Sequence, residues 1–264
     1  MSHRIDWADF EAVLFDLDGV ITPTAEVHER AWAELFSDFD YTPDDYLAHI
    51  DGRPRYDGVR AFLHSRGIEL PEGLPTDPPG SHTICAMGNR KNVVFNDVLD
   101  SEGIAPYPGS MAVMDLLDAA GVPQAVVSSS KNARRVLAAA GLGDRFSVVV
   151  DGITATAEGL AGKPAPDTFL RAADLLGVAP ARSVVVEDAV TGIAAGKDGG
   201  FGFVLGIDRG GNAAALAAHG ADAIVEDLAD TIETIRTERA ATIDTERAAT
   251  IDTERAATIE TEPA

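Results

Sequence analysis

From about residue 107 onward, short apolar runs alternate with longer segments of helical character. The runs are too short for helices and predict buried strands: 124–127, 147–150, 183–186, 203–207 and 223–225. The segments between them predict helices, and glycines follow two of these as stop signals: 109–120, 132–140, 166–176, 189–197 and 212–219. This alternation predicts a doubly wound parallel sheet with right-handed crossovers. The apolar run 12–15 adds a strand from the N-terminal end.

The stretch from about residue 24 to 102 breaks this alternation. It carries helical patterns at 26–36, 56–66 and roughly 81–99, separated by proline-rich segments and without a convincing strand pattern. We therefore expect an α/β fold with an inserted all-α cap domain. The cap would cover residues 24–103, and the core would consist of residues 1–23 and 104–235. Two connections between cap and core would form the hinge of a lid.

The C-terminal segment 236–264 is an octapeptide repeat. Thr-Glu-Arg-Ala-Ala-Thr-Ile-Asp begins at Thr237, begins again at Thr245, and begins a third time at Thr253 with Glu260 in place of Asp. Eight residues exceed two helical turns, so the isoleucines drift around a helix instead of forming one stripe. The repeat predicts a solvated helix or a disordered tail without a catalytic role. A partner-binding helix is the alternative.

The 264-residue chain has 43 acidic and 21 basic residues, which gives a formal net charge of -22. This charge argues against nucleic acid as a partner, since phosphate backbones require the opposite sign. A single cysteine, Cys85, rules out an intrachain disulfide and fits a reducing compartment. No signal peptide and no membrane-spanning run is apparent. We expect a cytoplasmic protein without a membrane partner, present as a monomer or weak homodimer.

Two acids follow the first predicted strand. Asp16 and Asp18 lie two residues apart, so in an extended chain they project the same way, from the sheet edge where α/β folds place ligands. Adjacent carboxylates repel and require a cation or a shared proton. The pair suits a nucleophile and an acid/base that work with Mg²⁺. The alternatives are acidic turn residues that cap the strand end or bind Ca²⁺.

Three further polar segments follow later strands. Ser128 follows strand 124–127 and suits a phosphate ligand at a helix start, or an ordinary helix cap. Lys163, in Gly-Lys-Pro-Ala-Pro, suits neutralisation of a nucleophilic carboxylate and a transferring phosphoryl group, or a plain surface charge. Glu187 and Asp188 follow strand 183–186 and suit Mg²⁺ ligation, or an acidic helix N-terminus.

Together the four segments lie at four strand ends, and their order resembles the four motifs of the haloacid-dehalogenase superfamily of phosphotransferases. The resemblance extends to about residue 231. It implies that Asp16 forms an aspartyl-phosphate and that Asp18 is the general acid/base. It implies that Ser128 and Lys163 bind the transferring phosphate. It also implies a Mg²⁺ cofactor with these ligands: Asp16, the backbone carbonyl of Asp18, Glu187 and Asp188.

The inserted segment narrows this resemblance to the β-phosphoglucomutase-like family. Thr24, His28 and Trp32 are similar to the start of that group's cap. Residues 51–58 are similar to its cap loop, whose arginine, here Arg55, grips the second phosphate of the substrate. The implied substrate-binding residues are His28, Trp32, Gly52, Arg55, Ser129, Ser130, Lys131 and Asn132. Taken alone, His28 and Trp32 would be a helical packing pair and Arg55 a solvated side chain.

Two positions depart from this pattern. Pro23 stands where these relatives commonly carry an acid, and Asp51 stands where some carry a lysine. The resemblance implies Mg²⁺-dependent conversion of a sugar phosphate, β-glucose 1-phosphate to glucose 6-phosphate, through an aspartyl-phosphate. A sugar-phosphate phosphatase is the alternative enzyme, and an acidic scaffold that presents the repeat is the non-enzymatic one. A dehalogenase is disfavoured, because those relatives lack a counterpart of Asp18 and need no metal.

Overall fold

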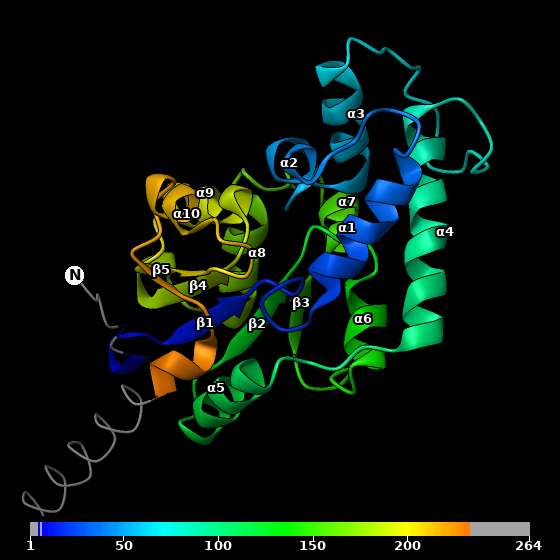
Figure 1. Cartoon of the computed structure of the whole chain (residues 1–264). Coiled ribbons are helices and arrows are strands. Elements are labelled where there is room, and N and C mark those ends of the chain that lie inside the picture. The colour runs from blue at the N-terminus through cyan, green and yellow to red at the C-terminus, as the bar shows by residue number, and fades with distance from the viewer. Residues whose placement is uncertain (1–4, 6, 233–264) are drawn as a thin grey trace, which may run out of the picture.

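A computed structural model describes residues 5 and 7–232 of the chain (Figure 1). Six strands form one sheet with the order β3-β2-β1-β4-β5-β6, and every neighbouring pair is parallel. The strands are β1 (Ala12–Phe15), β2 (Gln124–Val127), β3 (Val148–Val150), β4 (Ser183–Glu187), β5 (Phe203–Ile207) and β6 (Ala223–Val225). The chain builds outward from β1 to β3 and then crosses over to β4 on the other side. The carboxyl ends of β1 and β4 therefore flank the point where such sheets bind ligands.

Strand register brings the polar residues after the central strands to the same edge. Phe15 at the end of β1 pairs with Val126 of β2 on one side and Val186 of β4 on the other. The residues that follow these positions therefore leave the sheet side by side, as expected for parallel strands.

Helices cover both faces of the sheet. On one face lie α5 (Pro108–Ala119), α6 (Ala133–Ala139) and the 3₁₀ turn η4 (Leu228–Thr231), which share a core with Val13 and Phe15 of β1. On the other face lie α8 (Asp167–Leu176), α9 (Val190–Asp198) and α10 (Ala213–Ala218), which share a core with Ala12 and Leu14. The alternation of β1 side chains between the two cores is the period of two expected for a strand.

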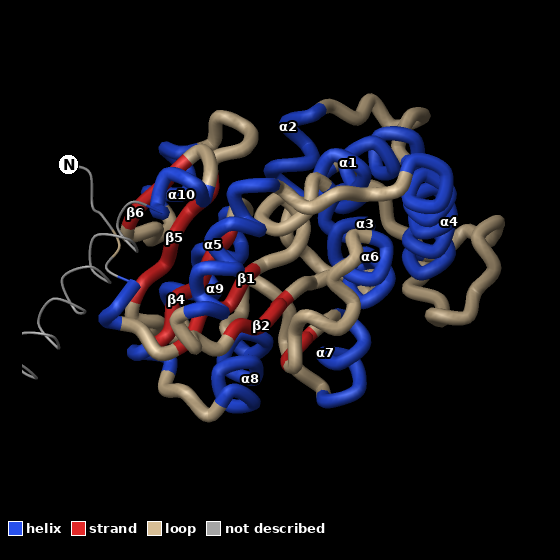
Figure 2. Tube along the Cα trace, turned by 90° about the horizontal axis from the view of Figure 1, so that it is seen from below, coloured by secondary structure: helices blue, strands red, loops and turns tan. Residues whose placement is uncertain are grey.

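A helical insertion, residues 24–102, separates β1 from β2. It consists of α1 (Thr24–Leu35), α2 (Pro43–Asp45), the π-helical turn η2 (Tyr46–Ile50), α3 (Arg55–Ser65) and α4 (Ile84–Glu102). Figure 2 shows these helices to one side of the strands. The insertion has an apolar cluster of its own, formed by Trp32, Leu35, Phe36, Ile50, Val59, Phe62, Leu63, Ile84 and Met87. The parallel α/β sheet with an inserted all-α part confirms the predicted fold class.

The two connections to the insertion lie against each other. The Tyr107 amide donates to the Ile21 carbonyl at 2.8 Å, and the Ser110 hydroxyl donates to the Val20 carbonyl at 2.6 Å. The start and the end of the insertion are thus tied together at the sheet, which is the arrangement that a two-stranded hinge requires.

Most predicted elements lie within a few residues of the observed ones, but some short helices were not predicted. These are α2, η2, α7 (Gly152–Glu158) and the 3₁₀ turns η1 (Trp7–Asp9), η3 (Pro180–Arg182) and η4. Among the described residues, none of the helices has the length and apolar character of a membrane span. The octapeptide repeat lies outside the described residues.

Candidate active site

A cavity of about 900 Å³ lies between the carboxyl edge of the sheet and the helical insertion. Its volume is within the range of small-molecule sites. Every site residue predicted from the sequence lines it except Asn132: Asp16, Asp18, His28, Trp32, Gly52, Arg55, Ser128, Ser129, Ser130, Lys131, Lys163, Glu187 and Asp188. Residues from both the insertion and the core therefore line one cavity.

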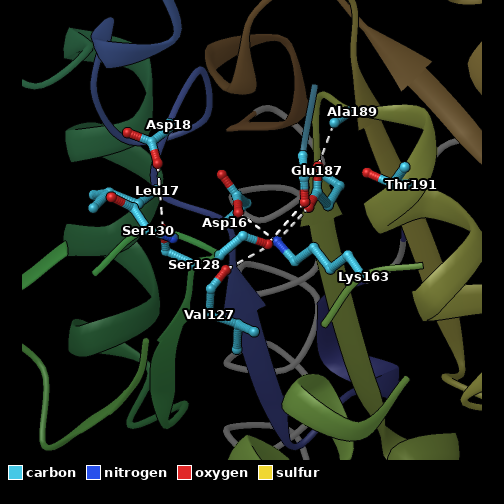
Figure 3. Close-up of polar contacts among 12 residues, drawn as sticks. Asp16, Leu17, Asp18, Val127, Ser128, Ser130, Lys163, Glu187, Ala189 and Thr191 are labelled. Atoms are coloured by element: carbon cyan, nitrogen blue, oxygen red, sulfur yellow. Dashed lines mark hydrogen bonds and ion pairs between the residues drawn. The ribbon is translucent and has the colours of Figure 1, made fainter. Parts of the chain in front are cut away.

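A buried lysine lies at the centre of the core side of this cavity. The Lys163 amine donates to Asp16 Oδ1 at 2.5 Å, to Glu187 Oε1 at 2.6 Å and to the Val127 carbonyl at 3.1 Å (Figure 3). All three N–H donors of the ammonium thus have acceptors, and Lys163 is only 3% exposed. A buried charge is tolerated where it is paired in this way.

The carboxylates around Lys163 outnumber it. Burial, followed by the neighbouring Asp51 and Glu187, raises the pKa of Asp188 well above its ordinary value. Burial also raises the pKa of Asp16, although Lys163 opposes this. Burial disfavours a charged Lys163, but Asp16 and Glu187 outweigh it and raise the pKa of the amine. The site therefore holds a fixed ammonium and an excess of carboxylates, which favours a further cation.

Three of these carboxylates fit a divalent metal ion. Asp16, Glu187 and Asp188 each offer one oxygen, and these atoms lie within 4.8 Å of one another. Two glycines leave the space that these carboxylates occupy. A Cβ at Gly19 would lie 1.7 Å from Asp188 Oδ2, and one at Gly192 would lie 1.8 Å from Glu187 Oε1. Hard oxygen donors in such a cluster suit Mg²⁺.

The Asp18 side chain lies apart from this cluster and is held from two sides. Its Oδ1 accepts from the Thr24 hydroxyl at 2.5 Å and lies 3.5 Å from His28 Nε2, both on α1. Its Oδ2 accepts from the Ser128 hydroxyl at 3.3 Å. Burial opposes ionisation of Asp18, but His28 and Thr24 outweigh it and lower its pKa to about 2. The ionised carboxylate is thus fixed between the insertion and β2.

The segment after β2 forms a turn into α6. The Ser128 hydroxyl accepts from the Ser130 amide at 3.0 Å, and the Ser130 hydroxyl accepts from the Asn132 amide at 3.1 Å. Both bonds are local serine turns that precede α6, whose N-cap residue Asn132 makes no side-chain cap bond, and both hydroxyls lie on the cavity wall. Ser128 is therefore not a helix cap, and its role as a phosphate ligand stays a prediction.

A second group of cations lies where the insertion meets the core segment between β2 and α6. Arg55, at the start of α3, donates to Asn92 Oδ1 at 2.7 Å, and Asn132 donates to the same oxygen at 2.6 Å. Lys131 lies 5.5 Å from the ring centroid of Tyr56. Asn132 thus does not reach the cavity wall but is joined to Arg55 through Asn92, a residue the sequence analysis did not single out.

A second buried lysine was also missed. The Lys91 amine, on α4, contacts His28 Nδ1 and lies 5.2 Å and 4.9 Å from the ring centroids of Trp32 and Phe95. Burial lowers its pKa well below the ordinary value. Trp32 itself is 4% exposed and packs in the core of the insertion with part of its surface on the cavity. The sequence feature that could have indicated Lys91 is its position on the apolar face of a predicted helix, four residues before Phe95.

The 51–54 loop, between η2 and α3, closes over the core side of the cavity. Burial, followed by the neighbouring Glu187, raises the pKa of Asp51 to about 7. Gly52 has a φ of +68°, and its carbonyl accepts from the Ser129 hydroxyl at 2.8 Å. The position where some relatives were expected to carry a lysine is thus a carboxyl group facing the acidic cluster.

Comparisons with known proteins agree with this geometry. A family model described as haloacid dehalogenase-like hydrolase matches residues 10–200. A β-phosphoglucomutase of Mycobacterium bovis is 47% identical over 239 residues, which cover 84% of this chain and 91% of that protein. Hexitol phosphatase A of Escherichia coli is 32% identical over 192 residues, which cover 71% and 78% of the two chains.

The fold is also shared with solved structures. The crystal structure of a β-phosphoglucomutase from Clostridium difficile superposes with a TM-score of 0.69 at 24% identity, covering 88% of this chain and 99% of that chain. This likeness confirms the fold. From the matched family model and the sequence relatives, the chain belongs to the haloacid dehalogenase-like hydrolases, in the β-phosphoglucomutase-like family, and is an enzyme of the phosphomutase or phosphatase type.

Proposed function

We propose that this enzyme is a Mg²⁺-dependent β-phosphoglucomutase that works through an aspartyl-phosphate on Asp16. One observation carries the proposal: the same cavity is lined by the centre formed by Asp16 and Lys163 and by two further cations, Arg55 from the insertion and Lys131 from the segment after β2. A substrate with two phosphates needs two such sites. The 47% identical relative named β-phosphoglucomutase supports the same activity.

The metal ligands in this proposal are Asp16, the backbone carbonyl of Asp18, Glu187 and Asp188. When bound, Mg²⁺ would offset the negative charge that develops on the transferring phosphoryl group. Lys163 already pairs with Asp16 and Glu187, so it places a fixed positive charge beside the nucleophile.

The chemistry then divides between Asp16 and Asp18. In the phosphoenzyme, O6 of β-glucose 1-phosphate attacks the phosphorus, the bond from phosphorus to the Asp16 carboxylate breaks, and Asp18 takes the O6 proton. The bisphosphate turns over in the cavity, and Asp16 attacks the phosphorus at C1. The bond from phosphorus to O1 breaks, and Asp18 returns the proton to O1, which gives glucose 6-phosphate.

Other cavity residues would hold the two phosphates and the rest of the substrate. Ser128 and Lys163 would bind the transferring phosphate, and Arg55 with Lys131 would bind the other one. The buried Lys91, beside His28, would donate to the substrate from the insertion side. Lys91 is thus a proposed binding residue in addition to those predicted from the sequence.

We also propose that residues 24–103 are a cap domain that opens and closes on the core formed by residues 1–23 and 104–235. The separate apolar cluster of the insertion and the paired connections support this division. Closure would exclude water from the phosphoenzyme, which otherwise hydrolyses.

The test is incubation of the enzyme with β-glucose 1-phosphate, Mg²⁺ and a trace of the 1,6-bisphosphate, with glucose 6-phosphate and free phosphate measured together. We expect glucose 6-phosphate as the main product and no turnover without the divalent ion. Arg55→Ala should lower mutase kcat/KM at least about a hundredfold, because it removes charge-assisted bonds to the second phosphate.

Arg30→Ala is the matched control, since this exposed arginine of α1 pairs with Glu102 outside the cavity. The second candidate is a sugar-phosphate phosphatase, which the 32% identical hexitol phosphatase favours. Release of free phosphate without glucose 6-phosphate, together with indifference to Arg55→Ala, would support that candidate and reject the mutase.

A further inference from the structure

The 51–54 loop rests on the core through two side-chain hydroxyls. Ser129, just after β2, donates to the Gly52 carbonyl at 2.8 Å. Thr191, in the first turn of α9, donates to the Asp51 carbonyl at 3.2 Å. The two donors come from separate core segments, and the two acceptors are consecutive carbonyls of the same loop. The loop is therefore fastened at two points to the core.

The backbone of the loop is shaped for this close approach. A Cβ at Gly52 would lie 2.1 Å from Thr191 Oγ1, and the φ of +68° at this position also favours glycine. At the end of the loop, Pro54 packs against Gly162 of the core, where an added Cβ would lie 2.5 Å from Pro54 Cγ. Loop and core thus meet with no space for a single added methyl group.

The two hydroxyls are separate from the reacting groups. The bonds of Ser129 Oγ and Thr191 Oγ1 in the described part of the chain run to the 51–54 loop, whereas the bonds of Asp16, Lys163 and Glu187 run among themselves and to the β2 and β4 ends. Removal of either hydroxyl therefore changes the hold on the loop without removing a reacting group. Thr191, unlike Ser129, does not line the cavity, so Thr191→Val acts on the loop alone.

We propose that Ser129 and Thr191 are positioning residues that latch the insertion closed over Asp16 and thereby set how often a sugar hydroxyl, rather than water, receives the phosphoryl group. This inference rests on the proposed mutase function. A neutral hydrogen bond shifts a two-state equilibrium by about fivefold to tenfold. Loss of both should make the open state, which admits water, much more populated.

The test uses Thr191→Val, Ser129→Ala and the double variant, with two readouts. The first is the ratio of free phosphate to glucose 6-phosphate formed from β-glucose 1-phosphate. The second is amide hydrogen exchange of the peptide that covers residues 46–56 in the protein without substrate. We expect the double variant to raise the phosphate ratio at least about tenfold and to exchange this peptide about tenfold faster, and the single variants to lie between.

Two controls isolate the latch. Thr191→Ser keeps the hydroxyl and should behave as wild type. Ser101→Ala removes an exposed hydroxyl that donates at 2.8 Å to the Asp97 carbonyl of its own helix, α4, outside the cavity, and should change neither readout. Unchanged exchange in the double variant would reject the latch. Faster exchange with an unchanged product ratio would show that the latch does not set whether the sugar hydroxyl or water receives the phosphoryl group, and would reject that role.

The two readouts also separate this inference from the function on which it rests. If the wild type makes no glucose 6-phosphate, the proposed function fails, and the exchange measurement still decides whether the hydroxyls hold the loop. If the wild type is a mutase and the double variant matches it in both readouts, the function stands and the latch is rejected.

Discussion

Two buried lysines face the same cavity, but their neighbours give them opposite electrostatic characters. Lys163 lies between the carboxylates of Asp16 and Glu187, and its pKa is raised despite burial. Lys91 contacts a histidine and two aromatic rings, and burial lowers its pKa. One lysine is therefore a fixed charge beside the nucleophile, whereas the other gives up its proton more easily than an ordinary lysine.

Replacement of Lys91 by methionine should separate stability from activity. Met fills the same apolar space without a buried amine, so we expect the free energy of unfolding at pH 7 to equal or exceed that of wild type. Loss of the amine donor to the substrate should lower kcat/KM about tenfold to a hundredfold. Denaturant unfolding and steady-state kinetics measure the two effects, with the exposed Lys197→Met as the control.

The same variant has a predictable pH dependence. The unfolded chain binds the Lys91 proton with the ordinary pKa of 10.5, and the folded protein binds it less tightly. The free-energy cost of burying the protonated Lys91 amine is therefore largest below the lowered pKa. It vanishes as the pH rises to 10.5. The advantage of Lys91→Met should shrink over that range. An advantage that grows with pH would contradict the lowered pKa.

Gly192→Ala tests whether the space around Glu187 matters. The added Cβ would lie 1.8 Å from Glu187 Oε1, the oxygen that accepts from Lys163. We expect kcat to fall at least about a hundredfold because the carboxylate must move. Gly58→Ala, in helix α3, is the control, since its Cβ meets only ordinary contacts at 3.5 Å. Circular dichroism checks that both variants fold, and wild-type kcat in Gly192→Ala would contradict this account.

At the scale of elements, local pattern was enough to predict the sheet. Strands β1, β2, β5 and β6 were predicted with the observed bounds because each is a short apolar run between turn residues. Helix α7 was missed because its residues 152–158 carry two threonines and an isoleucine, which are weak helix formers. The Asp151 carboxylate that accepts from the Ile153 and Thr154 amides caps it. A local cap therefore offsets weak helix propensity there.

The site was predictable where it follows strand ends and was not predictable where it depends on helix packing. Asp16, Ser128 and Glu187 follow predicted parallel strands, so their meeting at one sheet edge follows from topology. Lys91 and Asn92 enter the site only because α4 packs along α1 and across to α6. Such contacts between distant helices depend on side-chain packing, which a local pattern does not encode.

The insertion contains a carboxylate whose titration should be visible in stability. Asp45 accepts from Arg66 at 2.6 Å and from the Thr42 amide and hydroxyl at 2.9 Å. The hydrogen bond from Arg66 outweighs the opposing effect of burial and lowers the pKa of Asp45 to about 2, below the ordinary 3.8. The ionised Asp45 thus contributes fully to the free energy of unfolding above pH 3.8, and this contribution is lost as the pH falls toward 2.

Asp45→Asn should therefore be less stable than wild type at pH 6, and the difference should narrow between pH 4 and pH 2. Urea unfolding across this range gives the measurement. Asp44→Asn is the matched control, because this neighbour has no ion pair among those found in the described residues and should change stability little. A difference that stays constant down to pH 2 would contradict the role of the Arg66 pair.

At the scale of the whole molecule, the chain carries a formal net charge of -22. Self-repulsion of this size destabilises a compact state, and salt screens it. We expect Tm to rise by about 2–4 °C, the equivalent of about 1 kcal/mol, between 10 mM and 0.5 M sodium chloride. Scanning calorimetry measures it, and a Tm that falls with salt would show that attractive ion pairs dominate instead.

The whole molecule combines a rigid sheet edge with an insertion that completes the cavity. The core contributes Asp16, Lys163 and Asp188, whereas the insertion contributes Arg55 and Lys91. The proposed mutase reaction, in which a sugar bisphosphate must turn over, suits such a division between core and insertion.

The most direct measurement follows a labelled phosphoryl group. The enzyme is mixed with Mg²⁺ and ³²P-labelled glucose 1,6-bisphosphate, quenched in acid and digested, and the labelled peptide is sequenced. We predict label on the peptide that contains Asp16, its transfer to glucose phosphate in a chase with β-glucose 1-phosphate, and none on Asp16→Asn. Turnover without label on that peptide, or undiminished turnover by Asp16→Asn, would contradict this account.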